Sequence, residues 1–110
     1  MKVTLSHIVM GAAACLAVAA QAETLDRIRD TGVVTMGVRE ASGTMSYTLG
    51  NGKYAGFHVE LCEKALARMQ QQLKLPRLDI RYQMVTAQNR VPLVANGTVD
   101  VECGTTTNNA

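Results

Sequence analysis

Residues 57–84 read FHVELCEKALARMQQQLKLPRLDIRYQM, and this stretch decides the fold. Its first part predicts a helix over residues 57–73, because apolar side chains recur there at steps of three and four. This apolar stripe consists of Val59, Cys62, Leu66, Met69 and Leu73. Leu75-Pro76 ends the helix, since proline lacks an N–H and restricts the residue before it. From Leu78 to Met84 apolar and polar side chains alternate, which predicts a strand.

The segments before this stretch predict a second strand and a turn. Residues 33–38, VVTMGV, are mostly apolar on both faces, as is typical of a buried parallel strand. A short helix with Thr24 as its cap precedes this strand, and Gly32 is well placed to end it. Residues 41–56 are rich in Gly, Ser and Thr, and Asn51-Gly52 predicts a turn between two short extended pieces.

The segments after it continue the alternation of strands and helices. A short helix is expected at about residues 88–95, closed by Asn96-Gly97, although Pro92 lies in its first turns. Val99, Val101 and Cys103 alternate with acidic residues, which predicts another strand, and residues 104–109 form a polar loop. The fold class is therefore α/β, with βαβ units, right-handed crossovers and a mainly parallel sheet.

Composition excludes several classes of function. A chain of 110 residues forms one small domain at most, and its aromatic content of 4% requires an aliphatic, Met-rich core. A net charge of +2 without a basic run argues against nucleic-acid binding. No cofactor or metal site is expected, because the cysteine spacing fits no zinc pattern and His58 is the one histidine after residue 22.

No catalytic residues are predicted either. His58 lies near a helix start and is interpreted as a surface residue rather than a catalytic base. Asp100 and Glu102 share one strand face, where like charges are usually exposed to solvent or paired with a helix end, so they are not read as an acid–base pair. The chain is accordingly not expected to be an enzyme.

The N-terminus has the features of an export signal. Lys2 supplies a positive start, residues 8–20 are apolar, and Ala20-Gln21-Ala22 offers small residues for a signal peptidase. A membrane span is the alternative, but the apolar stretch is shorter than the roughly 20 residues that a span requires. Lipid attachment at Cys15 is a further alternative. We expect a signal peptide over 1–22, a mature chain over 23–110 and soluble export.

Two cysteines, Cys62 and Cys103, follow the signal peptide. Cys62 lies on the apolar stripe of its helix, and Cys103 lies on the face of its strand that carries Val99 and Val101. Both side chains therefore point toward one core. An exported compartment permits a disulfide between them, and buried free thiols are the alternative.

Polar segments follow three predicted strands. Arg39 follows the first, residues 86–90 with Arg90 follow another, and residues 105–107 follow the last. Ligands of such sheets collect at the carboxyl ends of the strands. Two guanidinium groups, several hydroxyls and the amides of a helix start suit a carboxylate. The alternative is that each arginine is a solvated surface charge.

Several ordered segments together resemble family 3 of the bacterial solute-binding proteins. They are TLDRI at 24–28, GVRE at 37–40, GF at 56–57, TAQNRVPL at 86–93, NGTVD at 96–100 and ECGTTTNN at 102–109. The resemblance implies a type II periplasmic-binding-protein-like lobe, with residues 23–110 as the N-terminal part of lobe 1. It also implies a monomeric periplasmic protein that serves the permease of an ABC importer.

The resemblance is strongest to the acidic-amino-acid branch, whose ligands are glutamate and aspartate. It implies that Arg39 and Arg90 bind the ligand's side-chain carboxylate, and that Thr105 and Thr107 contact the end common to all amino acids. Two departures are visible: Ala87 stands where the branch usually has Ser, and Thr105 replaces another Ser.

Family members continue past the Asn-Asn pair to an arginine that clamps the α-carboxylate, whereas this chain ends at Ala110. The lobe is thus expected to be incomplete at its C-terminus, and the chain is interpreted as a truncated fragment that binds weakly or not at all alone. Two alternatives share the fold: an exported enzyme resembling cyclohexadienyl dehydratase, and the ligand-binding domain of a sensor or receptor.

Overall fold

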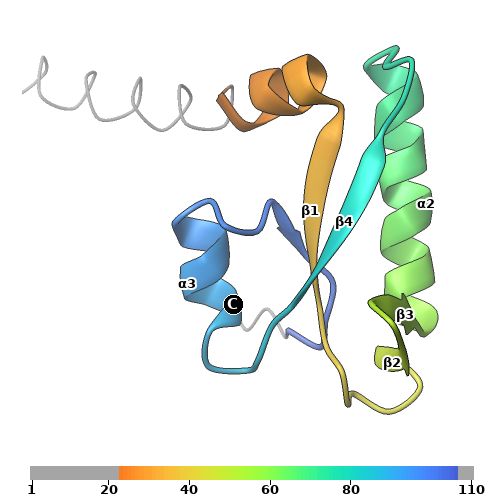
Figure 1. The fold of residues 1–110 in the computed structure, drawn as a ribbon, viewed down its shortest axis with the longest axis vertical. Helices are drawn as coiled ribbons and strands as arrows, with labels where there is room; N and C mark the ends of the chain where they lie inside the picture. The colour runs from red at the N-terminus through yellow and green to blue at the C-terminus, as the bar shows by residue number, and fades with distance from the viewer. Residues whose placement is uncertain (1–22, 107–110) are drawn as a thin grey trace, which may run out of the picture. The chain divides into compact units, whose positions relative to one another are not determined.

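The computed structural model describes residues 23–106, and the chain divides into two units, residues 1–31 and 32–110. In the first unit residues 23–31 are helical. The second unit contains β1 (Val33–Val38), β2 (Tyr47–Gly50), β3 (Lys53–Ala55), α2 (Phe57–Gln72), β4 (Asp79–Met84), α3 (Arg90–Ala95) and β5 (Val101–Glu102) (Figure 1). Among the described residues no helix is long and apolar enough to cross a membrane. The predicted signal peptide, residues 1–22, and Thr107 lie outside the described range.

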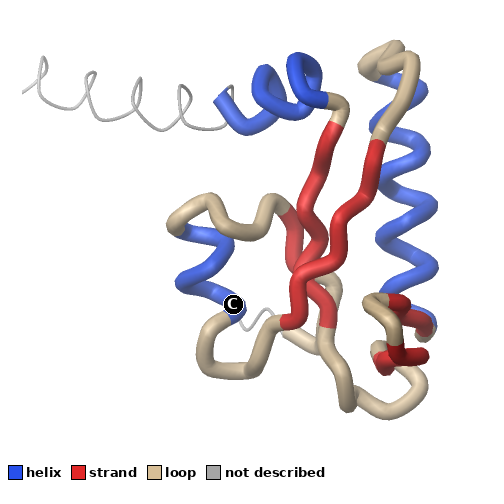
Figure 2. The backbone as a smooth tube through the Cα atoms, viewed as in Figure 1, coloured by secondary structure: helices blue, strands red, loops and turns tan. Residues whose placement is uncertain are grey.

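The main sheet is parallel, as the alternation of strands and helices predicts. Its strand order is β4-β1-β5, and β1 pairs in parallel with both neighbours (Figure 2). Met36 at the centre of β1 lies opposite Tyr82 on β4 and Val101 on β5. β2 and β3 form a separate antiparallel pair around the Asn51-Gly52 turn. The pairing confirms the predicted α/β fold with a mainly parallel sheet.

The two crossover helices lie on opposite sides of this sheet. The chain moves from β1 to β4 through α2, and it then returns across β1 to β5 through α3. Because parallel crossovers are right-handed, a reversal of direction sends the second helix to the other face. Figure 1 shows α2 and α3 on either side of the β1 and β4 strands.

The core is built on β1 and is aliphatic, as the composition requires. Val34, Met36 and Val38 are completely buried, and from α2 the predicted stripe contributes the buried side chains of Val59 and Leu66. Val85 and Val99 bury further apolar surface just outside the strands. Burial on this scale stabilises the unit by removing apolar area from water.

The last strand is shorter than the sequence predicts. The expected strand over 99–103 is regular only at Val101–Glu102, because Asp100 pairs with β1 through its side chain as well as its backbone. Its Oδ2 accepts a hydrogen bond from the Thr35 N–H at 2.9 Å, and its own N–H donates to the Thr35 carbonyl at 2.9 Å. Asp100 is therefore a part-buried structural partner of β1, a role that its strand position did not predict.

A disulfide joins α2 to the segment after β5. Cys62 and Cys103 are bonded, their Cα atoms are 6.3 Å apart, and the bond spans 41 residues of sequence. Cys103 is 5% exposed, so the bond lies at the edge of the core. This covalent link fixes the position of the loop that begins at Cys103.

Candidate functional site

The carboxyl ends of β1 and β4 flank a crevice. The loop after β1 leads toward α2, whereas the loop after β4 leads to α3 on the opposite side of the sheet. Loops that diverge from neighbouring strands in this way open a crevice at the carboxyl edge of a parallel sheet, and ligands of such sheets bind there. A cavity of about 310 Å³ occupies this place. Its lining consists of Arg39, Glu40, Ala41, Met84, Val85, Thr86, Ala87 and Gln88.

Arg39 directly follows β1 and is half-buried. Its backbone N–H and carbonyl are both hydrogen-bonded to the hydroxyl of Ser46. The Cγ atom of Arg39 packs against Gly104, where an added Cβ would lie 2.9 Å from it. The backbone of Arg39 is thus fixed by hydrogen bonds, and its aliphatic stem is in contact with Gly104 beside the crevice.

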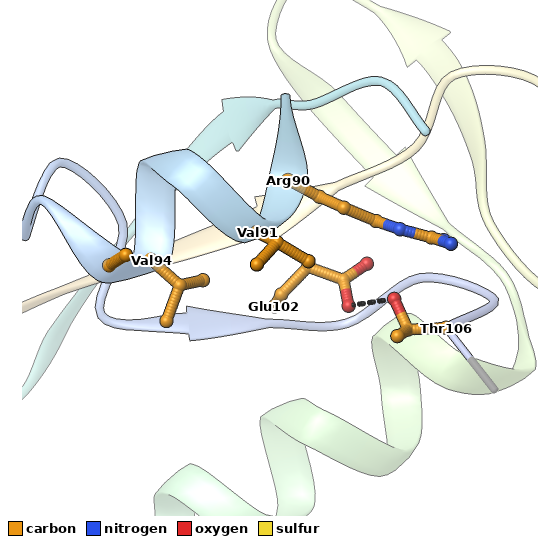
Figure 3. A pocket seen from close by; sticks show the side chains of 6 residues that line it. Arg90, Val91, Val94, Glu102 and Thr106 are labelled. Carbon is orange, nitrogen blue, oxygen red and sulfur yellow. Dashed lines mark hydrogen bonds between the residues drawn. The ribbon is translucent and has the colours of Figure 1, made fainter. Parts of the chain in front are cut away.

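Arg90 is the first residue of α3 and lines a second cavity, of about 260 Å³ (Figure 3). Val91, Val94 and Ala95 give this cavity an apolar wall from α3. Glu102 reaches it from β5, and Thr106 from the loop that follows. Arg39 thus lines one cavity together with Thr86–Gln88, and Arg90, two residues further along the chain, lines the other.

A reciprocal turn determines where α3 begins. The Thr86 N–H donates to Asn89 Oδ1 at 2.7 Å, and the Asn89 N–H donates to Thr86 Oγ1 at 3.1 Å. The two bonds close a turn over Thr86–Asn89, and the regular helix begins after this turn, at Arg90 rather than at the expected residue 88.

Several amides at the two helix starts are hydrogen-bonded within the chain. At α2 the first two N–H groups, of Phe57 and His58, donate to the carbonyls of Thr44 and Met45, each at 3.0 Å. At α3 the Arg90 N–H donates to the Thr86 carbonyl at 3.1 Å. These three amides are therefore engaged in the fold, and the two guanidinium groups are the charged donors at this edge.

The loop after β5 is held by contacts on three of its residues. Cys103 carries the disulfide, and the ring Nδ1 of His58 lies 2.6 Å from the Gly104 carbonyl. The Thr106 hydroxyl donates to Glu102 Oε2 at 2.6 Å, as Figure 3 shows. His58 is thus a part-buried structural residue rather than a surface one. Three anchors on a short segment give Thr105 a well-defined backbone position.

Glu102 is not the exposed strand residue that the sequence predicts. Its Oε1 atom is buried, and no hydrogen-bond partner for it lies among residues 23–106. A Cβ at position 104 would collide with this oxygen, so Glu102 packs directly against the glycine. The other carboxylate oxygen, Oε2, accepts the hydrogen bond from Thr106 and so stabilises the loop.

The structure brings most of the predicted site residues to one edge. Arg39, Arg90 and Thr105 all follow carboxyl ends of the parallel strands, and the Thr105 side chain is exposed. Within residues 23–106 no group of three or more His, Cys, Asp or Glu side chains is arranged to hold a metal. Two guanidinium groups, threonine hydroxyls and apolar walls suit a small carboxylate-bearing ligand.

Comparison with known proteins adds a family to this geometry. Residues 34–110 match the family of bacterial extracellular solute-binding proteins, family 3. An L-glutamate/L-aspartate-binding protein of Pseudomonas aeruginosa is 50% identical over 88 residues, which are 78% of this chain and 29% of that protein. Glutamate/aspartate import solute-binding proteins of Salmonella typhimurium and Escherichia coli are each 39% identical, over 98% and 82% of this chain and 37% and 30% of theirs. The chain thus spans about a third of the length of these relatives.

Two solved structures of similar fold are both of an ancestral amino-acid-binding protein, AncCDT-1. An ancestral cationic amino acid solute-binding protein is 27% identical with a TM-score of 0.63, and the match covers 78% of this chain and 34% of that one. A crystal structure of an ancestral amino-acid-binding protein, described as a precursor of cyclohexadienyl dehydratase, is 26% identical with a TM-score of 0.65 over 78% and 35% of the two chains. Proteins of this fold therefore include binders of acidic and of cationic amino acids. Selectivity between the two must come from the side chains at the binding site rather than from the fold.

Proposed function

Because the chain belongs to family 3 of the bacterial extracellular solute-binding proteins, we propose that it forms the first part of a protein that captures glutamate or aspartate for import. In this proposal Arg39 and Arg90 bind the side-chain carboxylate of the ligand. Thr105 and Thr107 contact the end that all amino acids share. The names of relatives that are 39–50% identical support the choice of ligand.

The observation that carries this proposal is the pair of arginines at the carboxyl edge of the sheet. Each guanidinium offers a planar fork of donors that matches a carboxylate. Arg39 lines one cavity with Thr86–Gln88, and Arg90 lines a second cavity that begins two residues later in the chain. A ligand that carries a carboxylate on its side chain satisfies both, whereas a cationic ligand meets like charge at the same place.

The disulfide supports export to the periplasm. Disulfides persist in the bacterial periplasm and are rare in the cytosol, where thiols are kept reduced. The bond between Cys62 and Cys103 therefore agrees with the predicted signal peptide over residues 1–22. In the periplasm the protein delivers its ligand to the permease of an ABC importer.

Binding without chemistry is favoured over an enzyme of the same fold. A catalytic acid or base must reach the reacting group. The His58 ring is bonded to the Gly104 carbonyl, and the carboxylates of Asp100 and Glu102 hold β1 and Thr106. These three side chains are engaged in hydrogen bonds that stabilise the fold. Their engagement favours a binding protein over a dehydratase.

Calorimetric titration of the complete gene product that carries this chain tests the proposal. L-Glutamate and L-aspartate are the ligands, and L-arginine and L-lysine are the controls of opposite charge. We expect saturable binding of the acidic pair and at least about hundredfold weaker binding of the cationic pair, because like-charge contact costs several kcal/mol. Equal or tighter binding of arginine contradicts the proposal, as does the absence of binding by both acidic ligands.

A further inference from the structure

Ser46 is a polar residue buried completely among the apolar elements. Its exposed fraction is 0%, and it lies in the loop between β1 and β2. The hydroxyl donates to the Arg39 carbonyl oxygen at 2.7 Å and accepts from the Arg39 N–H at 3.0 Å. A buried hydroxyl needs hydrogen-bond partners, and here its donor and one acceptor position both serve the backbone of a single residue.

These two bonds fix the backbone of Arg39 directly after the last sheet hydrogen bonds of β1. The last backbone bonds from the sides of β4 and β5 reach the Val38 carbonyl, which accepts from the Val85 N–H at 2.8 Å, and the Gly37 carbonyl, which accepts from the Cys103 N–H at 2.8 Å. Arg39 is the next residue along the chain. Beyond Arg39, the Glu40 carbonyl accepts from the Thr48 N–H at 3.3 Å. The Ser46 hydroxyl bonds to the N–H and the carbonyl of Arg39, as a neighbouring strand would do. It thereby prolongs the fixed backbone of β1 by one residue.

Ser46 is itself held in place by the loop and by the start of α2. The Ser46 carbonyl accepts from the Ser42 N–H at 2.9 Å, and the neighbouring Met45 carbonyl accepts from the His58 N–H at 3.0 Å. Gly56 packs so closely on this segment that an added Cβ would lie 2.8 Å from the Ser46 nitrogen. The hydroxyl is therefore a rigid support rather than a mobile loop group.

We propose that Ser46 is a positioning residue for the guanidinium of Arg39, and that it sets the affinity for a carboxylate without touching the ligand. The inference rests on the proposed function, in which Arg39 binds the ligand's side chain. An arginine has many rotatable bonds, and fixing its backbone removes part of the freedom that it otherwise loses on binding. The contact of its Cγ with Gly104 restricts the stem further.

A double-mutant cycle in the complete gene product tests this role. We expect Ser46→Ala to weaken glutamate binding about tenfold, since it removes two hydrogen bonds to one buried backbone unit. In an Arg39→Ala background the same change should have little further effect, because the group that Ser46 orients is absent. Ser42→Ala, which removes a hydroxyl from the same loop, is the matched control and should leave the Kd unchanged. Equal loss in both backgrounds, or no loss in either, overturns the proposal.

A second variant and a ligand-free measurement cover the other outcomes. If Ser46→Ala does not fold, Ser46→Cys keeps a side chain of similar shape, slightly larger and with a much weaker hydrogen-bonding group, and enters the same cycle. If the parent protein binds neither glutamate nor aspartate, the proposed function fails, and hydrogen exchange of the Arg39 amide decides the positioning role. We expect exchange at least about tenfold faster in Ser46→Ala than in the parent. An unchanged exchange rate overturns the inference.

Discussion

Removing the Cys62–Cys103 disulfide should destabilise the chain by an amount that its loop length sets. The bond spans 41 residues. Loop-closure entropy then predicts a loss of about 4 kcal/mol at 25 °C, because the unfolded chain regains the freedom that the bond denies it. That is a large share of the roughly 5–15 kcal/mol by which a domain is stable. Replacement by alanine avoids placing new polar groups at these partly apolar positions.

Urea unfolding followed by circular dichroism measures the effect. With a slope of about 1–3 kcal/mol per M, the midpoint of Cys62→Ala/Cys103→Ala should fall by roughly 1.3–4 M relative to the parent. A reductant should lower the midpoint of the parent by a similar amount and leave that of the double variant unchanged. If neither reductant nor substitution moves the parent's midpoint, the disulfide does not stabilise this fold and the reasoning is refuted.

Two further predictions concern the packing around α2. Burial, together with the hydrogen bond to Glu63 and its charge, raises the pKa of Tyr82 from 10.0 to about 12. The folded state thus favours the protonated phenol, and this stability is present below pH 10 and lost as pH rises toward 12. The urea midpoint should therefore fall further between pH 8 and pH 11 in the parent than in Tyr82→Phe. Gly56 has φ +127°, and a Cβ there would meet the Met45 carbonyl. Gly56→Ala should lower the free energy of unfolding by about 2–5 kcal/mol in a urea titration.

Matched variants make both predictions specific. Tyr47→Phe alters a tyrosine that is 39% exposed, and it should keep the pH dependence of the parent. Gly43 also has a positive φ, of +58°, but nothing lies within 4 Å of a Cβ there. Gly43→Ala should thus cost only the backbone penalty of about 1–2 kcal/mol. Equal pH dependence in Tyr82→Phe and the parent, or equal destabilisation at both glycines, contradicts the respective argument.

Periodicity predicted the elements better than it predicted their pairing. The stripe from Val59 to Leu73 and the alternation from Leu78 to Met84 correctly indicate α2 and β4. The order β4-β1-β5 does not follow from any local pattern, because apolar residues on both faces of β1 tell only that it is buried. The shortness of β5 was missed for a related reason: Asp100 pairs with Thr35 through its side chain, which strand periodicity does not encode.

The sequence predicts the positions of candidate-site residues that directly follow strands. It does not predict contacts that form when a loop returns to a residue distant in sequence. Arg39 and Arg90 could be placed at the carboxyl edge from topology alone. In the sequence Ser46 resembles any polar loop residue, because no local pattern indicates that its hydroxyl bonds to the backbone of Arg39. His58 and Glu102 looked exposed for the same reason, although both hold the loop that follows Cys103.

The selectivity between glutamate and glutamine tests most directly whether the two arginines read the side-chain carboxylate. These ligands have nearly the same shape and differ in one charge. In the complete gene product we expect glutamine to bind at least about hundredfold more weakly, since an unpaired buried guanidinium costs roughly 2–5 kcal/mol. In Arg39→Ala and in Arg90→Ala the ratio of the two Kd values should shrink to about ten or less. A parent that binds both ligands equally, or variants that keep the parent's ratio, would contradict the role assigned to Arg39 and Arg90.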